Sequence, residues 1–205
     1  GMAFAQGLGL GAILTLLALT VVVAGVPARS IAQASTPTLP EIDVDIDPGS
    51  VPEPELGAEF MALGMAGVAP DLAVMLAENL ALEAEAIRDS NGGLLALAAT
   101  GDRLGEVQRR VDDAVSTGVR VANEYTFTSL VLDAIPSEGG QSSVAVLVEA
   151  VGTVDTVTYD AAGREQSRTR APFHGTFTLR RVGGERWLIA SASESVTSPP
   201  SSGRG

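Results

Sequence analysis

The stretch GDRLGEVQRRVDDAVSTGVRVANEYTFTSLVLDA, residues 101–134, changes its hydrophobic period at Gly118. After this glycine, residues 123–134 are rich in Val, Thr and aromatic side chains and follow the two-residue period of a strand. Before it, apolar residues recur at the spacing of one helix face: Leu104, Val107, Val111 and Val115. The stretch therefore predicts a helix that ends at Gly118 and a β-strand soon after it.

Three more segments continue the strand pattern towards the C-terminus. They are SSVAVLVEAVGTVDTVTY (142–159), APFHGTFTLRRV (171–182) and ERWLIASASES (185–195). The connections carry turn residues, which are Gly139-Gly140, Asp160 to Gly163, and Gly183-Gly184. Adjacent strands joined by short turns predict an antiparallel meander of four strands.

Two helical patterns precede these segments. The longer one, APDLAVMLAENLALEAEAIRDSNGG (69–93), opens with Pro70 and closes at a run of Asn and Gly residues that favour left-handed backbone. The shorter one is ELGAEFMALGMAG (55–67). Helices followed by antiparallel strands indicate an α+β fold, with N-terminal helices packed on a four-stranded antiparallel sheet.

The first 34 residues predict a membrane-directed segment. Residues 1–28 contain no charged side chain, and LGLGAILTLLALTVVVAGV (8–26) is long enough to cross a membrane as a helix. Ala32-Gln33-Ala34 is the small-x-small pattern after which a signal peptidase cuts. Two interpretations of residues 1–34 stay open, a cleaved signal peptide and a retained transmembrane anchor. Either one predicts an extracytoplasmic location for the rest of the chain: periplasmic, lumenal or at the cell surface.

An acidic, proline-rich segment follows and predicts a disordered linker. Within it, Asp43, Asp45 and Asp47 are spaced like the first carboxylates of a calcium-binding loop. Such a loop needs glycine at its sixth position and glutamate at its twelfth, where this chain has Pro48 and Pro54, so calcium is not predicted. The predicted organisation is 1–34 signal or anchor, 35–55 linker, 56–90 helical segment, 91–196 α+β domain and 197–205 disordered tail.

The composition excludes several classes of function. The net charge of −12, from 25 acidic and 13 basic residues, disfavours binding to nucleic acid. The chain has no cysteine, which excludes disulfides, thiolate metal sites and a cysteine nucleophile. It also has no glycine-rich phosphate loop and no histidine-rich metal pattern. We therefore predict no metal, no cofactor and no catalytic residue.

The C-terminal half resembles the nuclear transport factor 2-like (cystatin-like) superfamily. The resemblance rests on FTLRRVGGERWLIASAS (177–193), in which an apolar/Arg strand, a Gly turn and a Trp-aliphatic strand form the last hairpin. The helix TGDRLGEVQRRVDDAVSTG (100–118) before YTFTSLVLDAI (125–135) is most similar to the extracytoplasmic or intermembrane-space domain of plastid and cyanobacterial division proteins. The resemblance implies a curved sheet backed by helices over residues 91–196, displayed behind a single membrane span.

Two functional hypotheses follow. The first is a non-enzymatic binding or scaffold module, exported or membrane-tethered, that engages a protein segment or an apolar small molecule through the curved sheet and also pairs as a homodimer through it. The residues expected to bind are Tyr125, Phe127, Phe173, Phe177, Trp187, Arg180 and Arg181. The alternative is a pocket enzyme, because the superfamily contains isomerases and polyketide cyclases; its base would be His174 or Asp133.

Overall fold

The computed structural model describes residues 44, 46–135, 144–183 and 186–197, which belong to one compact unit, residues 40–205. Short 3-10 helices are η1 (Pro48–Ser50), η2 (Ala66–Val68) and η3 (Gly92–Leu97). The α-helices are α1 (Ala58–Ala62), α2 (Ala69–Arg88) and α3 (Gly101–Thr117). The strands are β1 (Glu55–Leu56), β2 (Arg120–Ile135), β3 (Ala145–Tyr159), β4 (Glu165–Arg181) and β5 (Trp187–Val196).

The strands form one sheet in the order β1-β2-β3-β4-β5. The four long strands pair antiparallel with their sequence neighbours, which confirms the predicted meander and the α+β class. A fifth, two-residue strand, β1, pairs parallel with β2 and makes the sheet mixed, which is the difference from the four strands expected. Two residues are too short for a hydrophobic period, so the sequence pattern gives no sign of β1.

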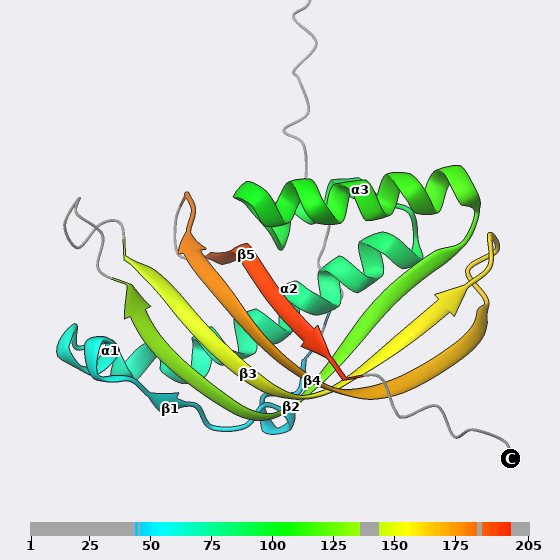
Figure 1. Cartoon of the computed structure of the whole chain (residues 1–205). Helices are drawn as coiled ribbons and strands as arrows, with labels where there is room; N and C mark the ends of the chain where they lie inside the picture. The colour runs from blue at the N-terminus through cyan, green and yellow to red at the C-terminus, as the bar shows by residue number, and fades with distance from the viewer. Residues whose placement is uncertain (1–43, 45, 136–143, 184–185, 198–205) are drawn as a thin grey trace, which may run out of the picture. The chain divides into compact units, whose positions relative to one another are not determined.

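The long strands β2, β3 and β4 curve, and helices α2 and α3 lie on the side towards which they curve (Figure 1). A bulge interrupts the β2–β3 pairing between Phe127 and Ser129. Opposite it stands Gly152, where an added Cβ would lie 2.0 Å from the carbonyl oxygen of Thr126. Glycine therefore allows the two backbones to approach closely at the bulge.

Two clusters of buried side chains join the helices to the sheet. The larger one lies between the first half of α2 and the strands, and Phe60, Leu72, Leu76, Val148 and Phe177 are completely buried in it. The smaller one packs the end of α2, η3 and α3 against β2 and β3. In α3, Val107 and Val111 are buried as the helical spacing predicts, whereas Val115 is 64% exposed, so the buried face ends one residue earlier, at Ala114.

Residues 46–56 lie against the domain, although most of them fall in the predicted linker. Asp47 caps η1 by accepting a hydrogen bond from the amide of Gly49 at 2.9 Å. Val51 and Leu56 pack on the larger core cluster, and the amide of Gly57 donates to the carbonyl of Leu132 at 2.7 Å. Val51 and Leu56, which flank Pro52 and Pro54, thus tie residues 46–56 to the folded unit.

The predicted signal or anchor (1–34), Asp43, Asp45 and nearly all of the predicted tail lie outside the described residues. Within the part of the chain that the structure describes, no helix has the length and apolar character needed to span a bilayer.

Candidate functional site

A surface hollow of about 570 Å³ lies beside Trp187, the first residue of β5. Arg181 ends β4 and is paired with Trp187 in the sheet register, so the last hairpin brings both side chains to the same rim. The other walls come from the connection between α1 and α2, from the first two turns of α2, and from the residue before β3. The lining residues are Leu63, Gly64, Met65, Val68, Asp71, Leu72, Met75, Val144, Arg181 and Trp187.

The chain between α1 and α2 makes the apolar wall of this hollow. Helix α1 ends at Ala62 with Leu63 as its C-cap, and Gly64 follows with a left-handed φ of 70°, which glycine adopts without strain. The chain then turns through η2 into α2, whose first turn contains Pro70. This path leaves Val68 44% exposed and Met65 half-buried at the edge of the hollow.

A second hollow of about 520 Å³ adjoins the first along helix α2, because Asp71 and Met75 line both. Its remaining walls come from η1, from the prolines before β1, and from the outward side of α2. The lining residues are Pro48, Val51, Pro52, Glu53, Pro54, Pro70, Asp71, Ala73, Val74, Met75 and Glu78. We call the two hollows together the α2 groove.

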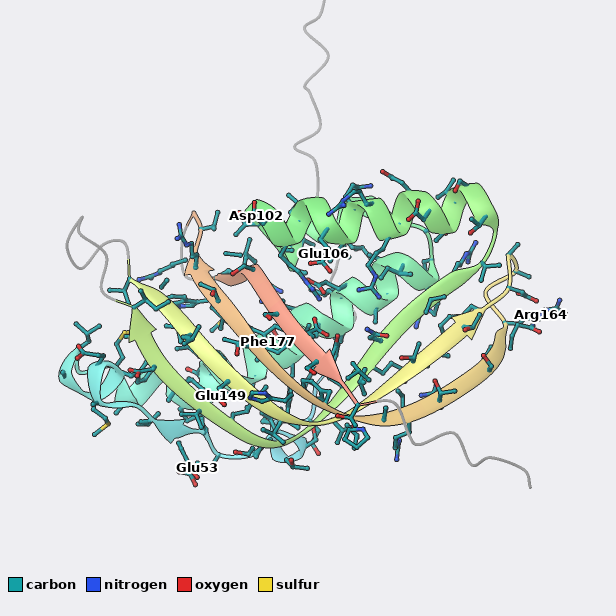
Figure 2. The ribbon with its side chains drawn as sticks, in the orientation of Figure 1. Glu53, Asp102, Glu106, Glu149, Arg164 and Phe177 are labelled. Carbon is teal, nitrogen blue, oxygen red and sulfur yellow. The ribbon has the colours of Figure 1, made fainter. Side chains whose placement is uncertain are left out.

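The charges of the α2 groove are mainly negative. Glu53, Asp71 and Glu78 line it, and Glu53 lies beside β1 on the outer side of the domain (Figure 2). Among the described residues, none of these three carboxylates has a hydrogen-bonding or ionic partner. The groove thus combines proline, methionine and tryptophan side chains with three carboxylates and the guanidinium of Arg181.

Trp187 is held in place by a polar contact that the sequence does not reveal. The side-chain amide of Asn79, which is fully buried in α2, donates to the backbone carbonyl of Trp187 at 2.8 Å. Arg186 donates to the Asn79 side-chain oxygen at 3.3 Å and to the carbonyl of Leu97 at 2.8 Å. These bonds fix the start of β5 against α2 and η3, and therefore the wall that carries the indole.

An ionic cluster centred on Arg103 joins α2, α3 and β5. Arg103 is only 2% exposed; its Nη2 donates to Glu83 Oε2 at 2.7 Å, and its Nη1 lies 3.2 Å from Glu194 Oε1. Glu106, near the start of α3 (Figure 2), is a third partner at 3.2 Å. The hydroxyl of Tyr125 donates to Glu194 and extends the cluster to β2.

The pKa shifts in this cluster follow from burial and charge. Burial raises the pKa of Glu83, although the hydrogen bond and positive charge of Arg103 oppose the shift. Burial alone would lower the pKa of Arg103, but its carboxylate partners outweigh burial and raise it. Burial and the neighbouring charge of Glu194 also raise the pKa of the Tyr125 hydroxyl. These groups are paired with one another, so the cluster holds the elements together.

The predicted binding residues are not brought together in one site. Phe127, Phe173 and Phe177 are buried in the core, and Phe177 lies between the sheet and α2 (Figure 2). Tyr125 is half-buried, and its ring meets that of Phe173 edge-on at 5.2 Å. Tyr125 and Phe127 also border a smaller hollow of about 270 Å³ between α2 and β2. The hollow beside Trp187 receives only Trp187 and Arg181, while the exposed Arg180 lines none of these hollows.

Neither residue proposed as a general base lines these hollows. The His174 side chain is 55% exposed, and its Nε2 lies 2.8 Å from Oε1 of Glu149 on the neighbouring strand β3. Asp133 accepts hydrogen bonds from the backbone amides of Phe60 at 3.2 Å and Ala134 at 2.8 Å. Asp133 therefore anchors the first turn of α1 on β2, which is a structural role.

Over the described ranges, no group of three or more His, Asp or Glu residues is placed to hold a metal ion. No protein-family model matches the chain, and no curated protein matches it. Among solved structures, the intermembrane-space region of the chloroplast protein ARC6 is similar to this chain at 16% identity and a TM-score of 0.47. The similarity covers 62% of this chain and 95% of that one. The resemblance to the nuclear transport factor 2-like superfamily stays a prediction.

Proposed function

We propose that this protein is a non-enzymatic, extracytoplasmic binding module that takes a segment of another protein in the hollow beside Trp187. The observation that carries the proposal is the lining of this hollow, where an indole, two methionines and aliphatic side chains meet a guanidinium at the surface. Tryptophan and arginine are enriched among the residues that dominate protein interfaces, and methionine adapts to varied partner shapes.

The arrangement of the sheet supports a surface mode of binding. Helices α2 and α3 cover the side towards which the sheet curves. Phe177 and Leu76, both completely buried, pack in the core between α2 and the sheet, where Figure 2 labels Phe177. A partner therefore has access to the outside of α2 and to the rim of the last hairpin. An extended segment fits this elongated surface better than a compact small molecule does.

The extracytoplasmic location rests on the hydrophobic segment within residues 1–34. We infer that this segment directs the folded unit across a membrane, whether it is later removed or retained. The alternative, a pocket isomerase or cyclase, gains no support from the geometry, because His174 and Asp133 are engaged with Glu149 and with backbone amides outside the hollows.

A site-specific photo-crosslinking experiment in the native host tests the binding surface. A photoreactive amino acid replaces Val68, which is 44% exposed at the rim of the hollow. The matched control replaces Glu149, which is 55% exposed on β3 and does not line the hollow. We expect one discrete protein adduct from position 68 and none from position 149. Equal adducts from both positions, or none from position 68, would contradict the proposed surface.

The location is tested separately with an introduced cysteine. Because the chain has no cysteine of its own, Glu149→Cys provides a single exposed thiol. A membrane-impermeant maleimide should label this thiol while the cytoplasmic side stays sealed, in intact cells for a surface or periplasmic domain and in opened lumenal vesicles for a lumenal one. Labelling that requires access to the cytoplasmic side would reject the location.

A further inference from the structure

We propose that the segment bound by this protein is cationic and carries a large apolar side chain, and that it lies along the whole α2 groove. The inference rests on the proposed function and specifies its partner. The apolar side chain enters the hollow beside Trp187, and the Lys or Arg side chains lie over the second hollow, where Glu53, Asp71 and Glu78 are placed.

Charge complementarity is the first argument. In the described part of the chain the three groove carboxylates have no cationic partner, whereas Glu124 and Asp155 on the sheet are paired with Arg168 and Arg170. Asp155, for example, receives two hydrogen bonds from Arg170, of 2.6 and 2.7 Å. Unpaired carboxylates beside apolar side chains favour a cationic partner, and the net charge of −12 adds attraction at long range.

The lining of the second hollow is the second argument. Pro48, Pro52, Pro54 and Pro70 line it together with Met75, and proline has no backbone N–H to donate. The lining therefore offers apolar surface and few hydrogen-bond donors beside its carboxylates. Lys and Arg match this combination, because their aliphatic stems cover apolar surface while their charged heads pair with carboxylates.

The place where the two hollows meet sets the spacing between cationic and apolar side chains in the bound segment. Asp71 and Met75 lie one helical turn apart and line both hollows, so a cation over Asp71 and an apolar side chain against Met75 belong to neighbouring parts of the partner. A short segment with alternating cationic and apolar residues meets both requirements.

The experiment uses the fluorescence of Trp187, which is the only tryptophan of the chain and lines the groove. The full chain in a nonionic detergent is titrated with a 12-residue peptide of alternating Lys and Leu, which contains no aromatic residue. Matched peptides carry Glu or Gln in place of Lys. We expect a saturable change in Trp187 emission with the Lys peptide, at least tenfold weaker binding of the Gln peptide, and no binding of the Glu peptide.

Variants locate the charges. Because an exposed ion pair contributes modestly, Asp71→Asn and Glu78→Gln should each weaken binding of the Lys peptide about two- to fivefold, and more when combined. Glu149→Gln, which removes an exposed carboxylate from β3, should leave the affinity unchanged. Circular dichroism of each variant checks that the fold is retained. A loss of affinity in Glu149→Gln equal to that in Asp71→Asn would show nonspecific attraction to a negative protein and overturn the proposal.

The outcomes separate this inference from the proposed function. Equal binding of the Lys, Gln and Glu peptides would overturn the cationic partner while leaving the groove as a binding surface. Absence of any change in Trp187 emission would also overturn the cationic partner. The proposed function itself falls when the crosslinking at position 68 fails, whatever the peptides do.

Discussion

Replacement of Arg103 by alanine should destabilise the fold strongly, because the change leaves Glu83 buried without its cation. The two side chains are 2% and 4% exposed, and the guanidinium holds the carboxylate through contacts of 2.7, 3.0 and 3.2 Å. Removing one partner of a buried ion pair costs about 3 to 5 kcal/mol. A loss of this size is a large part of the 5 to 15 kcal/mol that typically stabilise a native protein.

A comparison within the same cluster supplies the control. Glu106 contacts the same guanidinium at 3.2 Å, but its side chain is 45% exposed. Glu106→Gln should therefore cost no more than about 1 kcal/mol, as for exposed ion pairs. The double variant Arg103→Met with Glu83→Leu should recover the part of the stability that the unpaired Glu83 costs in Arg103→Ala. Glu194, which is 17% exposed and accepts a hydrogen bond from Tyr125, still lacks its cation in this variant.

The pH dependence adds a second test. The pKa of Glu83 is raised in the folded protein, so between its ordinary value near 4.5 and the folded value the native state binds more protons than the unfolded state. The contribution of Glu83 to the free energy of unfolding consequently falls as the pH rises through this window and is constant above it. Without Arg103 the pKa of Glu83 rises further, which widens the window. The destabilisation by Arg103→Ala should therefore be smaller at pH 5 than at pH 8.

Urea unfolding followed by circular dichroism at pH 5 and pH 8 measures these differences. A loss below about 1 kcal/mol for Arg103→Ala at pH 8, or a larger loss at pH 5 than at pH 8, would refute the reasoning on the buried pair.

Three further substitutions test the contacts between the sheet and the helices. Gly152→Ala should lower the free energy of unfolding in urea by at least about 2 kcal/mol, because the new Cβ meets the carbonyl oxygen of Thr126 at 2.0 Å. Gly105→Ala lies in α3 with open space around it and should instead stabilise the protein by about 1 kcal/mol. A loss of stability in Gly105→Ala would contradict the helix geometry. Tyr125→Phe removes the hydroxyl that donates to Glu194 and should cost about 1.5 kcal/mol, with unchanged stability indicating that the bond is not formed in solution.

The order of elements is readable from local patterns. Gly118 has a left-handed φ of 69° and ends α3, as its place between the helical and the two-residue periods predicts. The start of β4 is different: the strand begins at Glu165, six residues before the predicted boundary at Ala171. Residues 165–170 lack apolar alternation, and they are held by pairing with β3 and by ion pairs such as Arg170 with Asp155 at 2.6 Å.

The candidate site is less predictable, because its residues come from separate parts of the chain. Trp187 and Arg181 could be singled out from the last hairpin, but the walls from η1, η2 and α2 have no motif that links them to it. A two-residue period also cannot tell a buried aromatic such as Phe177 from one that lines a hollow. Arg103 looks like an ordinary surface charge of an amphipathic helix until the fold brings Glu83 and Glu194 to it.

The methionines of the chain allow the most direct test of the α2 groove as the binding surface. The cationic peptide is synthesised with benzophenone-alanine at one apolar position, because photoactivated benzophenone reacts preferentially with methionine side chains. Met65 and Met75 line the groove, whereas Met61 is 54% exposed and does not. After irradiation of the full chain with the peptide, mass spectrometry should find the adduct on Met65 or Met75. An adduct on Met61, or one on the β3 and β4 surface around His174, would contradict the account.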